Sequence, residues 1–201
     1  MFSHKINQVY KYSAYCRNTP TAHLSHPMDF QINPLISYTH LNPTKGHCCA
    51  IFWNLQDPPS CAYRIPRPST QTTPHLQRDQ YATQPPIAKM QIVCGILPEF
   101  WPIRIIHPNG ITVGDVLDTI HSVLHRRISQ EEFQLQSESR QRRINAQFLQ
   151  RCNMLPTERE RAECHANGVL RVDFLLDHTL FGGLSVSPNL DRTAVLTLRK
   201  A

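Results

Sequence analysis

Three side chains near the C-terminal end of the chain could carry out acid–base chemistry. The stretch RVDFLLDHTLFGGLS, residues 171–185, places Asp173, Asp177 and His178 close together in sequence. A carboxylate can orient a histidine that takes a proton from a substrate, and hydrolases and transferases use such pairs. A histidine from elsewhere in the chain, such as His107 or His121, could complete the set. The stretch is therefore either a catalytic loop or two strands joined by a turn.

The apolar pattern favours the strands. Successive side chains of a strand point to opposite faces, so the neighbours Asp177 and His178 diverge unless a bend interrupts the strand. The inward face then carries Val172, Phe174 and Leu176. The pair Gly182-Gly183 is typical of a β-bulge and matches no phosphate-binding loop. We interpret residues 171–199 as the C-terminal part of a sheet, with an Asp/His site as the alternative.

Two groups of histidine and cysteine could bind a metal, but neither has a complete set of ligands. His121 and His125 lie four residues apart on one predicted helix face, and Ser122 takes the place of the glutamate in the H-E-x-x-H motif. Residues 47–61 hold one histidine and three cysteines. Adjacent cysteines on a strand diverge, whereas zinc needs ligands that converge. We predict no metal and no other cofactor.

The cysteines indicate a reducing environment. They number seven, none forms a C-x-x-C pair, and the polar N-terminus has no apolar leader. We expect an intracellular protein, cytoplasmic or nuclear, with every cysteine reduced and Cys94 in the core. The first 28 residues carry no acid but three Lys or Arg residues, so an organellar targeting segment is the alternative.

The charge pattern argues against nucleic acid as a ligand. The net charge of +6 comes from 21 basic and 15 acidic residues, and the excess is dispersed along the chain. The densest basic stretch, RQRRINAQFLQR at 140–151, is typical of a solvated helix face. No run approaches the roughly 18 apolar residues that a membrane span needs. We expect neither a nucleic-acid-binding nor a membrane protein.

The large aromatic side chains gather near the ends of two predicted strands. They are Phe52, Trp53, Phe100 and Trp101. Core packing is the simpler interpretation. The functional interpretation is a docking surface for a protein or peptide, because aromatic residues are enriched in the centres of interfaces. These four residues are our candidates for binding.

Short strands and a proline-rich loop are predicted in the first half of the chain. Fourteen of the 16 prolines lie between Pro20 and Pro108, which favours extended backbone and loops. Apolar runs predict strands at 33–38, 48–55, 87–97 and 101–107, the last two as neighbours. Between them we expect a proline-rich surface loop near residues 66–86.

The middle of the second half has three helix-start signals. Each is a hydroxyl residue followed three positions later by an acid, at Thr112, Ser129 and Thr157. The first helix carries an apolar stripe from Val113 to Leu124. We expect the second to run through about Arg151 and the third to end at Gly168.

These elements together predict an α+β fold with a largely antiparallel sheet and a central group of about three helices. We assign residues 1–33 to an irregular N-terminal arm and residues 34–201 to a single domain.

Three stretches of the chain carry a family resemblance: the W-x-L strand in FWNLQDPPS, ATQPPIAKMQIVCGILPEFWPIRIIHPNGITVGDVLDTIH and GVLRVDFLLDHTLFGGLSVS. They resemble an uncharacterised family, a domain of unknown function found in mushroom-forming (basidiomycete) fungi. The likeness covers roughly residues 34–200, and such chains often carry Asp where this one has Asn54. The resemblance implies one domain and a fungal source, and it implies no reaction.

Our leading hypothesis is a non-enzymatic domain that binds a protein or peptide through an aromatic, exposed-edge surface. The competing hypothesis is a small hydrolase or transferase that uses Asp173 or Asp177 with a histidine. A pocket lined by those acids and histidines favours the enzyme, and a flat patch around Trp53 or Trp101 favours the binding domain.

Overall fold

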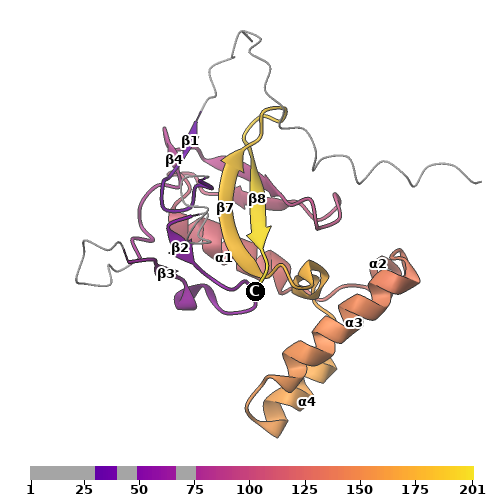
Figure 1. Ribbon diagram of the computed structural model, residues 1–201. Helices are drawn as coiled ribbons and strands as arrows, with labels where there is room; N and C mark the ends of the chain where they lie inside the picture. Colours follow the sequence, from indigo (N-terminus) through magenta and orange to yellow (C-terminus); the bar gives the residue numbers. More distant parts are fainter. Residues whose placement is uncertain (1–29, 40–48, 67–75) are drawn as a thin grey trace, which may run out of the picture.

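A four-stranded sheet organises the part of the chain that the structure describes. In this computed structural model, the described residues are 30–39, 49–66 and 76–201. The strands are β5 (Lys89–Val93), β6 (Ile103–Ile106), β7 (Leu180–Val186) and β8 (Thr193–Arg199), in the spatial order β6-β5-β8-β7. β5 pairs with β6 and β7 with β8 in antiparallel fashion, whereas β5 and β8 are parallel (Figure 1). The predicted α+β class with a largely antiparallel sheet is confirmed.

Two smaller antiparallel pairs lie beside β7. β1 (Gln31–Ile32) pairs with β4 (Thr83–Gln84), and β2 (Ile51–Phe52) pairs with β3 (Tyr63–Arg64) after the 3-10 turn η2 (Pro59–Cys61). Single bridges, Ser37 to Leu184 and Asn54 to Leu180, join this region to β7. The strand β1 falls within the segment predicted to be an irregular arm, of which residues 1–29 lie outside the described part.

The first predicted helix is confirmed as α1 (Val113–Leu124). The Thr112 hydroxyl accepts the amide N–H of Asp115 at 3.1 Å, and the Asp115 carboxylate accepts the Thr112 N–H at 2.9 Å. This reciprocal capping box satisfies two amides that the helix start would otherwise leave unpaired. The predicted apolar stripe is buried, and α1 packs on β6, whose Ile103 and Ile105 point inward.

The second predicted helix is wrong, because two helices occupy its range. α2 (Gln130–Gln134) follows the capping box at Ser129, as expected, but α3 (Glu138–Asn153) has its own cap at Ser137. The Ser137 hydroxyl accepts the amide of Arg140, so the chain turns and starts again. α4 (Glu158–Asn167) begins after Thr157 and ends at Gly168, as predicted; Gly168 has a φ of 73°, which suits glycine.

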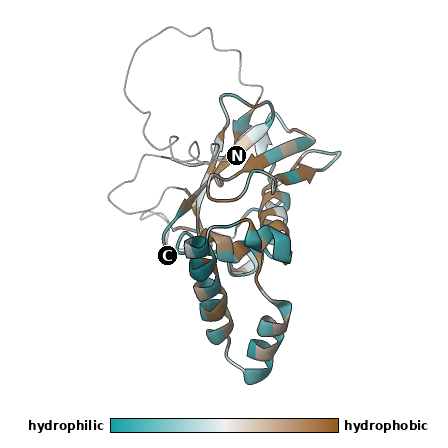
Figure 2. Cartoon of the chain, turned by 90° about the vertical axis from the view of Figure 1, so that its right-hand side faces the viewer, coloured by the Kyte–Doolittle hydropathy of each residue, from teal (hydrophilic) through white to brown (hydrophobic). Residues whose placement is uncertain are grey.

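The pair α3 and α4 projects away from the sheet (Figures 1 and 2). Figure 2 shows that the residues of these helices are mostly hydrophilic. Buried side chains are few here: Ile144 and Cys152 in α3, and Cys164 in α4. No helix among the described residues is both long enough and apolar enough to cross a membrane.

A disulfide between Cys152 and Cys164 joins α3 to α4. The prediction that all seven cysteines are reduced is therefore wrong. The two Cα atoms lie 5.4 Å apart, because the turn after α3 brings positions twelve residues apart onto facing helices. Cys94 is buried in the core, as expected, and its burial raises the pKa of its thiol.

Two strand predictions are wrong for a shared reason, which is that a local side chain closes a turn. At 33–38, the Asn33 side chain accepts the amide of Leu35, and the backbone turns before Ser37. At 171–177, the chain forms the 3-10 helix η3 (Arg171–Leu175), and the Asp173 carboxylate accepts the amide of Leu170. Residues 172–175 are all buried, so no strand alternation exists there.

The C-terminal hairpin is instead β7 with β8. Its register shifts between Phe181 and Gly183, which confirms the predicted bulge at the glycine pair. A Cβ atom at Gly183 would come within 2.7 Å of the backbone of Tyr38, so this position needs glycine. Leu184 and Leu196 are buried and Leu198 is partly buried, as expected.

The end of the predicted proline-rich loop belongs to the core rather than to the surface. Residues 67–75 lie outside the described part, but Leu76, Ala82 and Thr83 are buried. The amide of Ala82 donates to the carbonyl of Ile111, and its carbonyl accepts from Asn33. The segment thus connects β1 to the start of α1.

The strand predicted at 48–55 is shorter than expected, because β2 is only two residues long.

Candidate functional site

Asp173, one of the acids considered for catalysis, lies in a buried ion pair. Its side chain is fully buried, and its two oxygens accept from Nε and Nη2 of Arg151 at 2.8 and 2.9 Å. A buried carboxylate is tolerated when it is paired in this bidentate way. The amide of Leu170 is a third donor, and the side chain has no exposed surface, so Asp173 is shielded from any substrate in solution.

The side chains of Asp177 and His178 are in contact, whereas on a strand they would point to opposite faces. His178 Nδ1 lies 2.9 Å from Asp177 Oδ1, because the two residues follow η3 in a turn where Leu176 has a φ of 55°. Asp177 also contacts Lys200 Nζ at 3.1 Å. The hydrogen bond from Lys200 is the main reason that the pKa of Asp177 is lowered. The structure thus places Asp177 in a surface ion pair, apart from the buried Asp173.

His121 stacks on His125 on the outer face of α1. Their ring centroids are 3.8 Å apart, and His125 Nδ1 lies 3.0 Å from the carbonyl oxygen of His121. Burial, and then the charge of the nearby His125, lower the pKa of His121. Among the described residues, no group of three or more His, Cys, Asp or Glu could hold a metal ion. His47 and Cys48 lie outside them.

The four aromatic candidates fall into two groups. Trp53 is buried, tilted against Phe181, and its neighbour Phe52 stacks on Tyr63. Trp101 is also buried, with its ring 4.7 Å from that of Phe174. The expected flat patch around the tryptophans is therefore absent from the described surface. Only Phe100 is largely exposed, at 57%, and its ring meets the edge of Trp101.

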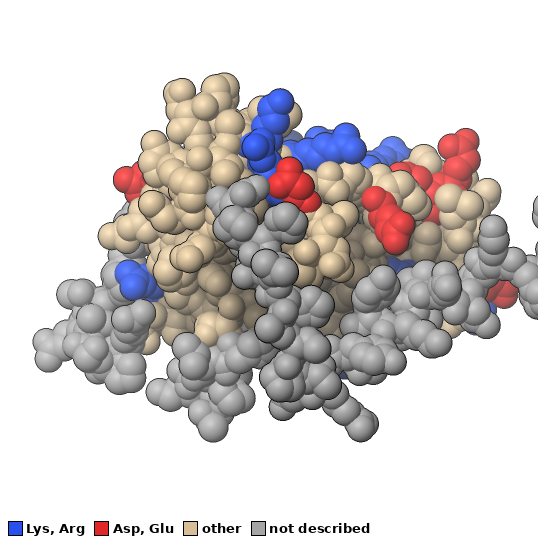
Figure 3. All heavy atoms as spheres, turned by 90° about the horizontal axis from the view of Figure 1, so that it is seen from above, with Lys and Arg blue, Asp and Glu red and all other residues tan. Residues whose placement is uncertain are grey.

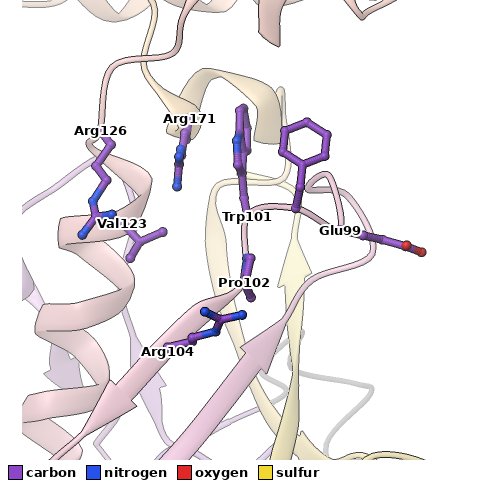
Figure 4. A pocket seen from close by; sticks show the side chains of 8 residues that line it. Glu99, Trp101, Pro102, Arg104, Val123, Arg126 and Arg171 are labelled. Carbon is purple, nitrogen blue, oxygen red and sulfur yellow. The ribbon is translucent and has the colours of Figure 1, made fainter.

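Phe100 and Trp101 line an open pocket of about 480 Å³ that sequence reasoning missed. We call it the Phe100 pocket. Three arginines from separate segments share it: Arg104 on β6, Arg126 just after α1, and Arg171 at the start of η3 (Figure 4). The other lining residues are Glu99, Phe100, Trp101, Pro102 and Val123. In Figure 4 the arginines surround one space, and Glu99 points away from them.

Arg171 is held against the wall of this pocket. Its guanidinium carbon lies 4.6 Å from the centre of the Trp101 ring, a cation–π contact. Its nearest carboxylate is that of Glu132, 3.9 Å away, and its Nε atom has no hydrogen-bond partner among the described residues. Burial is the main cause that lowers the pKa of Arg171, and the charge of Arg126 adds to it.

A hydrogen bond between Glu132 and Trp101 holds both side chains in position next to Arg171. The indole N–H of Trp101 donates to Glu132 Oε1 at 2.6 Å, while Glu132 Oε2 accepts the amide of Ser129 at 2.8 Å. Burial alone would raise the pKa of Glu132, but these hydrogen bonds and Arg171 together lower it. The carboxylate that caps α2 therefore also orients the pocket's tryptophan.

The comparison with known families adds one finding. Residues 51–192 match a family of unknown function, DUF6699. The chain belongs to the DUF6699 family. The matched DUF6699 range contains the sheet up to β7, the helices α1 to α4 and every residue of the Phe100 pocket. Searches of curated proteins and of solved structures found no match.

Proposed function

We propose that this DUF6699 domain is a non-enzymatic binding domain for a peptide segment of a partner protein, and that the Phe100 pocket is its site. The observation that carries the proposal is an exposed aromatic ring among the residues that line an open pocket. Phe100 is 57% exposed, although the neighbouring Trp101 is buried. Aromatic side chains that stay exposed beside a concave site are typical anchors of protein interfaces.

The free side of β6 supports a peptide ligand. β6 is the last strand in the sheet order, and no other described strand pairs with its outer edge. Arg104 and Ile106 face outward from it, and Ile106 is 68% exposed. An extended peptide could add to such an edge through backbone hydrogen bonds. Because Arg104 lies both on β6 and in the Phe100 pocket, one peptide could use both surfaces.

The alternative, a small hydrolase or transferase, has one observation in its favour. Asp177 and His178 are in contact, as an acid–histidine pair would be. The pair is shared with Lys200, however, and side-chain exposures of 46% and 35% leave it in contact with water. Water screens such a pair and competes for its protons, so we favour the binding domain.

Selection from a displayed peptide library tests this proposal. Purified chain is immobilised, enriched peptides are sequenced, and their dissociation constants are measured against the wild type and two variants. We expect Phe100→Ser to weaken binding by about tenfold or more, as loss of an interface anchor does. Leu149→Ser is the matched control, because Leu149 is a similarly exposed apolar residue on α3. Equal binding to both variants, or no enriched peptide, would contradict the proposal.

The fungal source and the intracellular location stay predictions from the sequence. The resemblance to proteins of mushroom-forming fungi supports the first. The Cys152–Cys164 disulfide counts against a compartment where thiols are kept reduced.

A further inference from the structure

We infer that the Phe100 pocket recognises an oxyanion, the carboxylate or phosphate group of an acidic residue in the bound peptide. This inference rests on the proposed function for the peptide, but the anion site itself is argued from the charges of the pocket. Three guanidinium groups surround one space, and a ligand with negative oxygens is the complement that they lack.

The positive charge of the pocket is only partly neutralised within the described chain. Arg104 and Arg126 make no side-chain hydrogen bond or ion pair there. Glu99 is the single acid that lines the pocket, and Figure 4 shows it directed away from the arginines. Arg171 forms one ion pair, with Glu132 at 3.9 Å, and the oxygens of Glu132 also accept from Trp101 and Ser129. Three like charges at one pocket are stabilised when an anion joins them.

The side chain of Arg171 is held in place before a ligand binds, and one of its donors is free within the described part of the chain. Its stacking on Trp101 limits the rotation of its side chain, and Trp101 is itself held by Glu132 and Phe174. Less entropy is therefore lost when a ligand binds. The buried Nε of Arg171 lacks an acceptor, and an unsatisfied buried donor is unfavourable. An oxygen of the ligand is an acceptor of the required kind.

The chemistry of the arginines selects the class of ligand. Guanidinium groups bind carboxylate and phosphate through paired N–H donors, which a neutral amide or a cation cannot match. The pocket volume of about 480 Å³ is larger than one such group needs, so neighbouring atoms of the ligand would enter too. The exposed ring of Phe100, which also lines the pocket, suits an apolar residue next to the acidic one.

The distribution of charge on the molecule fits a peptide with one anion better than a nucleic acid. A nucleic-acid site needs basic residues along a continuous track. On the face shown in Figure 3, Lys and Arg groups gather along one border, but Asp and Glu groups lie among them. Such mixed charge disfavours a long polyanion and tolerates one local anion.

The first test uses inorganic phosphate and succinate as probes, titrated at constant ionic strength. The indole N–H signal of Trp101 and the Nε–H signal of Arg171 are followed by NMR. We expect both signals to shift, and the apparent affinity to fall about tenfold in Arg104→Gln/Arg126→Gln. The matched control is Arg142→Gln/Arg143→Gln, which removes the same charge from the exposed face of α3 and should bind as the wild type does. Equal losses in both variants, or no shift at either signal, would overturn the anion site.

The second test separates the anion site from the peptide proposal. Three synthetic versions of each selected peptide are compared, with Glu, phosphoserine or Ser at the acidic position. Tighter binding of the Glu or phosphoserine version that depends on Arg104 and Arg126 supports the inference, and the better of the two identifies the source. Peptides that bind equally well with Ser overturn the inference while the proposed function stands. If the pocket binds anions but no peptide is selected, the proposed function is overturned. If an RNA dodecamer displaces the acidic peptide, a nucleic acid rather than a peptide supplies the bound anion, and the peptide ligand is overturned.

Discussion

Single residues of this chain connect parts of the fold that are distant in sequence. Arg151 is the clearest case, because its guanidinium contacts both oxygens of Asp173, the carbonyl of Gly168 and the sulfur of Cys164. It thereby joins α3, the end of α4 and η3 at one point. η3 in turn supplies Phe174 beneath Trp101 and Arg171 beside it. The wall of the Phe100 pocket therefore depends on a buried ion pair that lies outside the pocket.

Phe174 and His178 should differ sharply in their effect on stability. Phe174 is fully buried, so Phe174→Ala should lower the free energy of unfolding by about 3 to 5 kcal/mol. His178 is a turn residue in an exposed pair, so His178→Ala should stay within about 0.5 kcal/mol of the wild type. Urea unfolding of both variants measures this. A stable Phe174→Ala would refute the core assignment, and a folded His178→Ala that loses a later-found activity would restore the enzyme hypothesis.

Glu132 should make stability depend on pH in the acid range. Its pKa is lowered in the folded chain, so its contribution is present above the pKa of the unfolded state and is lost as pH falls through the folded pKa. Glu132→Gln should therefore flatten the decline in the urea midpoint between about pH 6 and pH 3. The exposed Glu99, as Glu99→Gln, is the control. An unchanged acid decline in Glu132→Gln would show that its hydrogen bonds to Trp101 and Ser129 do not form in solution.

At the scale of elements, helix starts are set by neighbouring residues, and their loss should have a modest, local cost. Thr112→Ala removes the hydroxyl that accepts the Asp115 amide, so we expect a loss of about 1 kcal/mol in the free energy of unfolding. The comparison is Thr112→Ser, which keeps the hydroxyl and should retain most of the stability. Urea midpoints of the two variants decide the matter, and equal losses would mean that the methyl group rather than the cap matters.

The distance in sequence between interacting residues explains which elements could be predicted from the sequence. The capping boxes and the stripe of α1 depend on residues within one or two turns of each other, and these predictions are confirmed. η3 looked like a strand because its apolar content was visible, whereas the partner that holds Asp173, Arg151, is 22 residues away. The Phe100 pocket is still less local, since its arginines lie at positions 104, 126 and 171. The one signal in the sequence was Arg104, at an outward position of β6 and three residues after Trp101.

As a whole, the molecule consists of a sheet-centred body and a projecting helical arm, α3 with α4 (Figure 1). The body contains most of the buried apolar side chains, including those of α1, η3 and the sheet. Ile144 of α3 belongs to the core of the body, and the outer part of the arm is held by the disulfide and by Arg151. Because few apolar contacts stabilise the outer arm, it should open separately from the body.

Removing the disulfide should therefore loosen the arm and leave the body intact. The bond closes a loop of about twelve residues, and constraining such a loop stabilises by about 3 kcal/mol. In Cys152→Ser/Cys164→Ser, we expect hydrogen exchange of the α4 amides to quicken by about a hundredfold. The amides of β5 and β8 should exchange as in the wild type, because their hydrogen bonds lie within the sheet. Cys61→Ser, at an exposed cysteine without a disulfide, is the control. Faster exchange throughout the sheet would show that the arm and the body unfold together, and unchanged exchange in α4 would show that Arg151 and Ile144 hold the arm without the disulfide.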